Sequence, residues 1–213
     1  MMGRVSECTP LISWSGPKPA TETHSYILDW NGTLSKGQQL ASDKVIGAIQ
    51  TNTHLLVWVV CGAGKTEVLF KGIETALTQG KRVCIATPRT DVVLELSPRL
   101  QQVFPKIEIA TLYGGSEDRI KNAPLTIATT HQLLRYYRAF DTIIIDEVDA
   151  FPYSIDASLQ YAVQQAQKGK SATIYLSATP STDMQRNVQL KKLHAVTIPA
   201  RYHRHALPVP TFH

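Results

Sequence analysis

Short apolar runs recur along the chain, and amphipathic stretches separate them. The runs at Leu55–Val60, Val83–Thr87 and Thr142–Ile145 are almost continuously apolar. That pattern is typical of strands buried on both faces of a parallel sheet. By the same criterion, further strands are expected at Ile107–Leu112, Leu125–Ala128 and Ala172–Leu176.

The amphipathic stretches have helical spacing. In Thr66–Thr78, the apolar residues Val68, Leu69 and Ile73 fall on one side, and Gly80 stands just past the end. Other helices are expected at Gln38–Ile49, at Asp91–Val103 with Asp91 or Thr90 as its cap, at His131–Tyr137 and at Ser154–Gln167. Alternating strands and helices with short connections predict a mainly parallel sheet with helices on both faces.

The positions of proline and glycine divide the chain into three parts. Proline and glycine interrupt residues 1–33, which are expected to form an irregular arm with one short strand at Tyr26–Leu28. Residues 34–200 are expected to form one domain. Residues 201–213 contain two prolines and are interpreted as a linker.

Composition narrows the class of protein. The net charge of +5 and the pI of about 9.1 permit an acidic partner such as nucleic acid without requiring one. The three cysteines are far apart and form no C-x-x-C pair, so neither a disulfide framework nor a zinc site is expected. No apolar run approaches the ~20 residues that span a bilayer, and a cytoplasmic location is expected, with attachment to the inner face of the cell membrane left open.

A glycine loop, Gly62-Ala63-Gly64-Lys65-Thr66, lies between a predicted strand and a predicted helix. Glycines let backbone N–H groups surround phosphates; Lys65 is placed to reach the β- and γ-phosphates and Thr66 to coordinate Mg²⁺. The full G-x-x-x-x-G-K-[ST] pattern has glycine at its first position, where this chain has Val59. The loop predicts ATP and Mg²⁺ binding on a three-layer α/β/α RecA-like P-loop NTPase domain. The alternative is an ordinary strand–turn–helix.

A second motif, Asp146-Glu147-Val148-Asp149, follows the apolar strand that ends at Ile145. Carboxylates at the carboxyl end of such a strand stand where parallel sheets bind ligands. Asp146 is expected to hold Mg²⁺, and Glu147 to orient and deprotonate the attacking water. Asp149 is expected to contact a neighbouring motif. A solvated acidic turn is the alternative.

Two weaker signals complete the predicted nucleotide-binding site. Ser177 and Thr179 follow a strand, and their hydroxyls can bond to the acidic turn and couple it to a neighbouring domain. Gln38 stands at a helix start, where its amide can read the adenine edge by one donated and one accepted hydrogen bond. A plain Ser/Thr turn and a surface glutamine are the alternatives.

Three loops that each follow a strand are candidates for DNA contact. Helix N-termini, hydroxyls and one arginine suit a phosphate backbone without reading bases. The alternative is helix capping alone. The residues concerned are Pro88, Arg89, Gly114, Gly115, Thr129 and Thr130.

In order and type, these motifs resemble those of superfamily 2 helicases of the DEAD/DEAH-like kind. The detailed strings are similar to those of the ComFA family, the late competence ATPases of transformable Gram-positive bacteria. The strings that carry the resemblance are Val57–Glu67, Thr87–Val92, Ala128–Leu134 and Asp146–Tyr153. The similarity extends over nearly the whole chain.

The resemblance implies ATP hydrolysis that depends on single-stranded DNA and drives import of that DNA during transformation. It implies ComFC, DprA and the membrane DNA channel as partners. The family also has an upstream four-cysteine zinc module and a second RecA-like domain. Zinc is expected only in that upstream module. The chain is therefore interpreted as a first RecA-like domain. An arginine finger from the second domain can be worth about 10³–10⁵ in rate, and slow hydrolysis is therefore expected here. Nucleotide contacts are expected at Gly62 to Thr66, Glu67 and Gln38.

Two other functions stay open. A replication-restart helicase of the PriA type shares the glutamine at the helix start and a zinc module, whereas the Asp146–Tyr153 string argues against it. A nucleotide-dependent module that docks partners and does no transport would not need Glu147 as a base.

Overall fold

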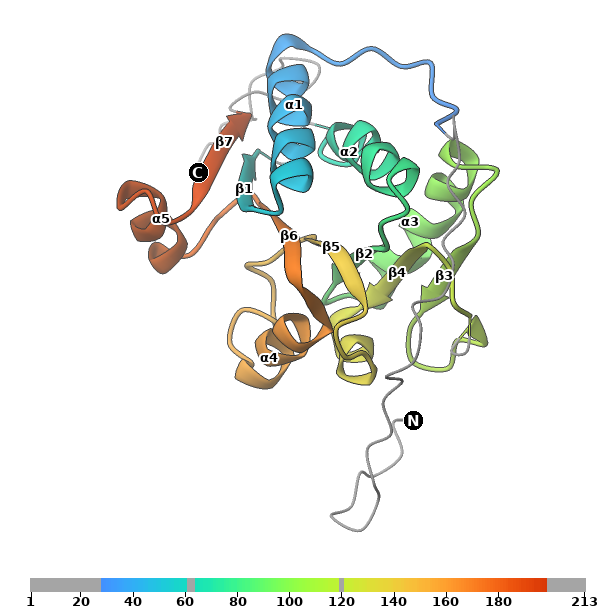
Figure 1. The fold of residues 1–213 in the computed structure, drawn as a ribbon. Helices are drawn as coiled ribbons and strands as arrows, with labels where there is room; N and C mark the ends of the chain where they lie inside the picture. The colour runs from blue at the N-terminus through green and yellow to red at the C-terminus, as the bar shows by residue number, and fades with distance from the viewer. Residues whose placement is uncertain (1–27, 61–63, 119–120, 199–213) are drawn as a thin grey trace, which may run out of the picture.

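The computed structural model describes residues 28–60, 64–118 and 121–198. Its centre is a seven-stranded sheet in the order β3-β4-β2-β5-β6-β1-β7, and every strand pair in it is parallel (Figure 1). This confirms the predicted fold class. The strands are β1 His54–Val59, β2 Val83–Thr87, β3 Ile109–Leu112, β4 Leu125–Thr129, β5 Phe140–Ile145, β6 Gln167–Ser177 and β7 His194–Ile198.

Helices cover both faces of this sheet. They are α1 Lys36–Thr51, α2 Glu67–Thr78, α3 Thr90–Val103, α4 Ala157–Ala166 and α5 Thr182–Gln189, with a 3-10 helix, η2, at Thr130–Arg135. Figure 1 shows α1, α2 and α3 on one side of the sheet and α4 on the other. The result is the three-layer α/β/α arrangement expected from alternating elements.

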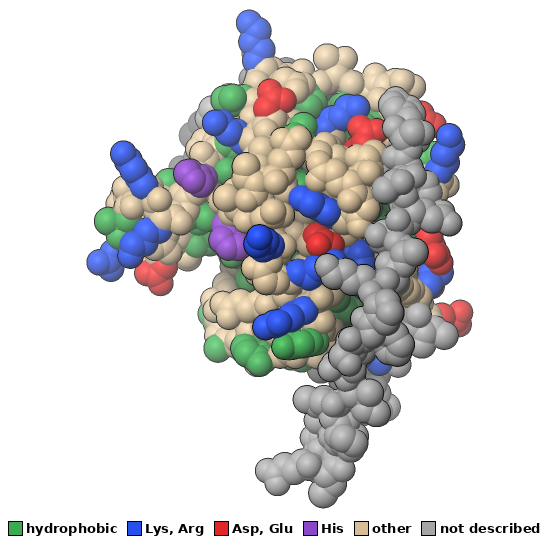
Figure 2. Space-filling view, in the orientation of Figure 1, with side chains coloured by type: hydrophobic (Ala, Val, Ile, Leu, Met, Phe, Trp, Pro, Cys, Tyr) green, Lys and Arg blue, Asp and Glu red, His purple; other side chains and the backbone are tan. Residues whose placement is uncertain are grey.

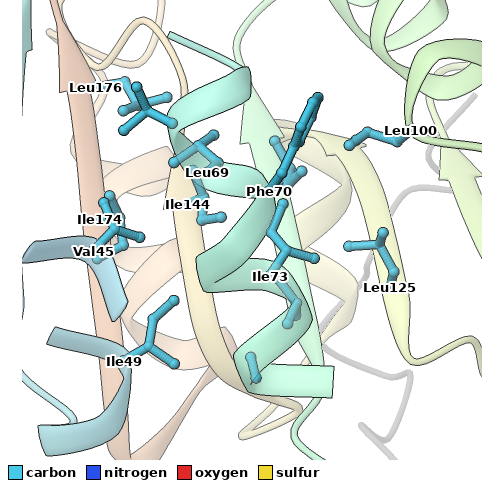
Figure 3. Packing of buried hydrophobic residues seen from close by; sticks show 14 of the residues in the cluster. Val45, Ile49, Leu69, Phe70, Ile73, Leu100, Leu125, Ile144, Ile174 and Leu176 are labelled. Carbon is cyan, nitrogen blue, oxygen red and sulfur yellow. The ribbon is translucent and has the colours of Figure 1, made fainter. Parts of the chain in front are cut away.

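The core divides at the sheet because side chains alternate along each strand. In β5, Ile144 packs with the α1–α2–α3 cluster, whereas Ile143 and Ile145 pack with the cluster under α4 and η2. Figure 3 shows Val45 of α1 and Phe70 of α2 among the buried side chains of the first cluster. Two buried faces per strand explain why the strands read as continuous apolar runs.

Helices α1 and α2 pack closely because Gly72 has no side chain. A Cβ placed at Gly72 would lie 2.6 Å from Cγ1 of Val45 and 3.1 Å from Cδ1 of Ile49. The contact holds the start of α1 beside the start of α2. It therefore brings Gln38 near the loop that precedes α2.

The start of α3 differs from the prediction. The residue before the helix is Arg89, and no side chain caps the first turn. Asp91 pairs with Arg89 instead of capping, so neither Asp91 nor Thr90 has the predicted role. Side-chain caps are present at α1, through Ser35, and at α4, through Asp156.

Several element bounds were wrong for local reasons. The helix expected to begin at Ser154 begins after its Asp156 cap. The one expected at His131–Tyr137 is the 3-10 helix η2. Ile107 belongs to a turn, with its N–H bonded to the Phe104 carbonyl, so β3 starts later. Helix α5 and the edge strand β7 were not predicted, since α5 has no buried residue and only Val196 and Ile198 of β7 are buried.

Parts of the predictions lie outside the described residues. These include the arm at 1–27, most of the short strand at Tyr26–Leu28, and the linker at 201–213; Leu28 itself is buried but belongs to no strand. Among the helices of the described ranges, none has the length and apolar character needed to cross a bilayer.

Candidate nucleotide-binding site

The described part of the glycine loop, Gly64 to Thr66, leads from β1 into α2. Gly64 has a φ of +68°, a conformation that costs other residues about 1–2 kcal/mol. A Cβ there would lie 2.5 Å from Nε2 of Gln38 and 3.2 Å from Oε2 of Glu67. The position therefore requires glycine for its conformation, whereas the two close atoms are the ends of flexible side chains that could shift. Gly62 and Ala63 lie outside the described residues.

Lys65 bridges this loop to the acidic motif. Its Nζ lies 2.6 Å from Oδ1 of Asp146 and 3.6 Å from Oε1 of Glu147. Asp146 follows β5 directly, its side chain is 5% exposed, and its N–H donates to the Ala86 carbonyl at 2.8 Å. The fold thus brings together two motifs that are 81 residues apart in the chain.

Glu147 has a left-handed backbone, with a φ of +57°. Such a conformation at a residue other than glycine costs about 1 kcal/mol or more and is concentrated at functional sites. The bonded neighbours Asp146 and Val148 hold it in place, because the Val148 N–H donates to the Leu176 carbonyl at 3.2 Å. The turn directs the 30%-exposed Glu147 side chain towards Lys65.

The residues present fit a magnesium–nucleotide complex. Asp146 supplies a buried carboxylate, and Thr66 supplies a hydroxyl that makes no capping bond to α2. The described residues contain no group of three or more His, Cys, Asp or Glu that could hold a metal by themselves. Mg²⁺ commonly takes only one or two protein ligands and completes its shell with phosphate and water, so a two-ligand set suffices.

Gln38 lies beside the phosphate loop, as a nucleotide-contacting residue must. Its side chain is buried, its Oε1 accepts from the Ser35 N–H at 2.8 Å, and its Nε2 approaches the Gly64 carbonyl at 3.5 Å. The amide oxygen of a glutamine has two lone pairs, so it can accept two hydrogen bonds. Reading of adenine by Gln38 stays a prediction.

Glu67, predicted to contact the nucleotide, is held by a residue that the sequence did not reveal. Arg99 of α3 forms an ion pair with Oε1 of Glu67, while Oε2 is buried without a hydrogen-bond partner among the described residues. Nothing in the local sequence around Arg99 marks it, because the pair joins two helices 32 residues apart.

The acidic turn also contacts the Ser177–Thr179 turn. The Thr179 hydroxyl donates to Oδ2 of Asp149, and Oγ of Ser177 accepts from the Thr179 N–H at 3.0 Å. The indole N–H of Trp58 donates to the Ala178 carbonyl at 3.1 Å and ties this turn to β1. The structure therefore brings Asp149, Ser177 and Thr179 together; Trp58 was missed, since an apolar run gives no sign of its polar edge.

The residues predicted to contact DNA differ in their exposure to solvent. Gly114 and Gly115 are exposed. Arg89 is also exposed and makes a two-point ion pair with Asp91, at 3.1 Å and 2.5 Å. Hydrogen bonding to Asp91 raises the pKa of Arg89, and the same bond lowers the pKa of Asp91.

The other candidates are covered. Pro88 and Thr129 are buried, and Thr130 is fully buried with an Oγ1 that has no partner among the described residues. These side chains close the ends of β2 and β4, which lie inside the sheet. The expected hydroxyl contacts at Thr129 and Thr130 are therefore not offered at the surface, and a phosphate there could meet only the backbone.

Known proteins resemble this chain in sequence. Residues 31–182 match the family described as type III restriction enzyme, res subunit (ResIII). The whole chain is 58% identical to competence protein ComFA of Bacillus subtilis, of which it covers 46%. ComFA of Streptococcus pneumoniae is 41% identical over 86% of the chain and 42% of that protein. The chain thus spans less than half the length of these relatives.

More distant proteins share the fold. Replication restart protein PriA of Haemophilus influenzae is 29% identical over 79% of the chain and 25% of that protein. A hypothetical ATP-dependent RNA helicase from Sulfolobus tokodaii superposes with a TM-score of 0.59 and 21% identity, covering 77% of this chain and 54% of that one. A DEAD box protein from Methanococcus jannaschii gives a TM-score of 0.59 and 17% identity over 81% and 56%.

The fold and these relationships agree on the class of domain. The chain belongs to the ResIII family of helicase-like ATP-binding domains, and it is a homologue of the competence protein ComFA.

Proposed function

We propose that this chain is the ATP-binding motor domain of a DNA translocase, an ATPase that depends on single-stranded DNA and drives its uptake during natural transformation. The observation that carries the ATPase part is the meeting of Lys65 with Asp146 and Glu147 at the carboxyl edge of the sheet. The uptake role is supported by the 58% identity to a competence protein.

The residues divide the chemistry among them. Lys65 and the N–H groups of the glycine loop balance phosphate charge. Asp146 and Thr66 would hold Mg²⁺, which when bound neutralises charge on the β- and γ-phosphates. Glu147 accepts a proton from the attacking water and orients it. Gln38 and Glu67 flank Gly64 and are assigned to the rest of the nucleotide.

Coupling to DNA runs through the bonded turns. The Asp149–Thr179 bond joins the turn that carries Glu147 to the turn after β6, so movement of one displaces the other. Arg89 and the exposed glycines Gly114 and Gly115 are assigned to DNA phosphates. A second RecA-like domain would supply the arginine finger; ComFC, DprA and the membrane channel are the proposed partners, at the cytoplasmic face of the membrane.

Nucleotide binding and hydrolysis by three forms of the chain test the proposal. The wild-type chain should bind a fluorescent ATP analogue with Mg²⁺ and hydrolyse ATP slowly, with little stimulation by DNA. Lys65→Ala should lose binding, whereas Glu147→Gln should keep binding and lose the residual hydrolysis. Brisk DNA-dependent turnover by this chain would contradict the expected need for a second domain.

Two alternatives are separated by the same samples. If ATP only serves docking, Glu147→Gln should leave partner docking intact. The 29% identity to PriA favours a replication-restart helicase as the second candidate. That function predicts preference for forked DNA over plain single strands in a binding competition, whereas an uptake motor should show none.

A further inference from the structure

Exposed aromatic rings stand beside cations on the outer side of α4 and η2. Tyr137 is 56% exposed and Tyr161 is 60% exposed. Arg135 and Arg138 flank Tyr136 and Tyr137 in the chain, and both arginines are exposed. Figure 2 shows hydrophobic side chains next to Lys and Arg at the bottom of the view, where Figure 1 places α4. We call Arg135, Tyr137, Arg138, Tyr161 and Lys170 the basic–aromatic face.

Backbone bonds hold the segment after η2 against the end of α4. The N–H of Arg138 donates to the Gln165 carbonyl at 2.8 Å, and the N–H of Ala139 donates to the Ala166 carbonyl at 2.8 Å. The segment after η2 therefore runs along the last turn of α4. Tyr161 lies four residues before Gln165, on the same side of that helix, and Lys170 follows closely after the helix ends.

The five residues of the face include no carboxylate; the acidic residues that border it in the chain are Asp141 and Asp156, and Asp156 interacts electrostatically with His131 of η2. Residues 130–140 and 157–172 include no Asp or Glu. Lys168 is neutralised by Asp141 at 2.6 Å, whereas no ion pair joins Arg138 or Lys170 to a carboxylate among the described residues. A cluster of cations without interspersed acids attracts a polyanion.

The aromatic rings indicate which kind of polyanion binds this face. Arg138 lies over the Tyr137 ring at 5.3 Å, so a cation and a π-face are presented together. Binding of single-stranded nucleic acid without sequence preference combines these two features, since bases stack on aromatic rings and phosphates meet cations. A folded acidic protein would gain less from rings that stand apart on the surface.

The position relative to the assigned DNA loops is also suitable. Helix η2 starts at Thr130, directly after β4, and ends at Arg135. Six residues of 3-10 helix span about 12 Å at ~2.0 Å per residue. Resting on the proposed single-stranded DNA substrate, we infer that a strand bound at Arg89 and Gly114–Gly115 passes the end of β4, which lies between β2 and β3, and continues along η2 onto the basic–aromatic face.

Binding of fluorescent oligothymidylate to this chain, measured by anisotropy over a range of salt concentrations, tests the inference. Arg138→Ala combined with Lys170→Ala should reduce the slope of log K against log salt by about 1.4, at ~0.7 per lost phosphate contact. Tyr161→Ala should weaken binding about tenfold, and Tyr161→Phe should not, because the ring is retained.

The matched control is Lys44→Ala combined with Lys106→Ala. Both lysines are exposed and lie on α1 and before β3. This variant should keep the wild-type salt slope. ATP binding by every sample should equal that of the wild type, which shows that each variant is folded.

The outcomes separate the two proposals. If the face variants bind as the wild type does while Arg89→Ala binds more weakly, the basic–aromatic face is not a DNA surface and the inference is overturned, with DNA binding elsewhere intact. If the wild type does not bind oligothymidylate even at low salt, the inference and the DNA part of the proposed function both fail. Binding of an acidic protein by the face, without any effect of its variants on DNA, would likewise overturn the inference.

Discussion

Lys65 and Asp146 form an ion pair of 2.6 Å between the phosphate loop and the end of β5. The carboxylate is nearly buried, whereas the lysine side chain is 37% exposed. Oε1 of Glu147 lies 3.6 Å from the same Nζ, so two carboxylates share one lysine charge. Under the proposed function, Lys65 would bind phosphate and Asp146 would hold Mg²⁺ in place of this contact.

Removing the lysine should leave Asp146 as an unpaired buried charge. We expect Lys65→Ala to lower the free energy of unfolding by about 2 kcal/mol, a value reduced from that of a fully buried pair because Lys65 is partly solvated. Added Mg²⁺ should raise the Tm of this variant more than that of the wild type. In Lys65→Ala combined with Asp146→Asn the difference should vanish; an equal response to Mg²⁺ in all three would contradict the prediction.

Gly64→Ala should impair both stability and nucleotide binding. An added Cβ would strain the backbone at a φ of +68° and displace the end of the Gln38 side chain, so we expect a loss of about 1–2 kcal/mol and weaker ATP binding. Gly47→Ala is the control, because nothing lies within 4 Å of its Cβ and it stands inside α1. That variant should gain about 0.5–1 kcal/mol. Chemical denaturation measures both.

The Asp149–Thr179 bond should act on coupling more than on stability. Both groups are solvent-accessible, and a double-mutant cycle with Asp149→Ala and Thr179→Val should give an interaction energy of about 1 kcal/mol or less. ATP affinity should stay unchanged in each variant. In the longer protein, DNA-stimulated hydrolysis should fall in both single variants; unchanged stimulation would rule out the coupling role.

Alkaline pH should destabilise the fold through buried thiol and phenol groups. Burial raises the pKa of Cys84 above 9.0 and the pKa values of Tyr153 and Tyr175 above 10.0. The stabilising contribution of each is complete below its unfolded-state pKa and is lost as the pH rises through its folded-state pKa. The Tm should therefore begin to fall above about pH 8.5, where the thiol of the unfolded chain ionises, and should fall more steeply above about pH 10, where its phenols ionise. Cys84→Ala should be less stable at pH 7 yet show a shallower fall; an unchanged slope would exclude the thiol.

Much of the fold could be predicted from local pattern. Strands such as Val83–Thr87 were found because burial on both faces demands continuous apolar residues. The edge strand β7 escaped, since only Val196 and Ile198 of its five residues are buried. The cap of α3 was misjudged because Asp91 had a competing partner in Arg89.

For the site, the order of residues by itself determined the chemistry: glycines, a lysine and a hydroxyl after one strand, and two carboxylates after another. Only the tertiary structure decided which groups meet. It paired Lys65 with Asp146 and Glu67 with Arg99. It also buried Thr129 and Thr130, whose hydroxyls were expected to be exposed. The physical reason is that local sequence sets propensity and pattern, whereas contacts across 32 or 81 residues depend on how strands are ordered in the sheet and on which side helices pack.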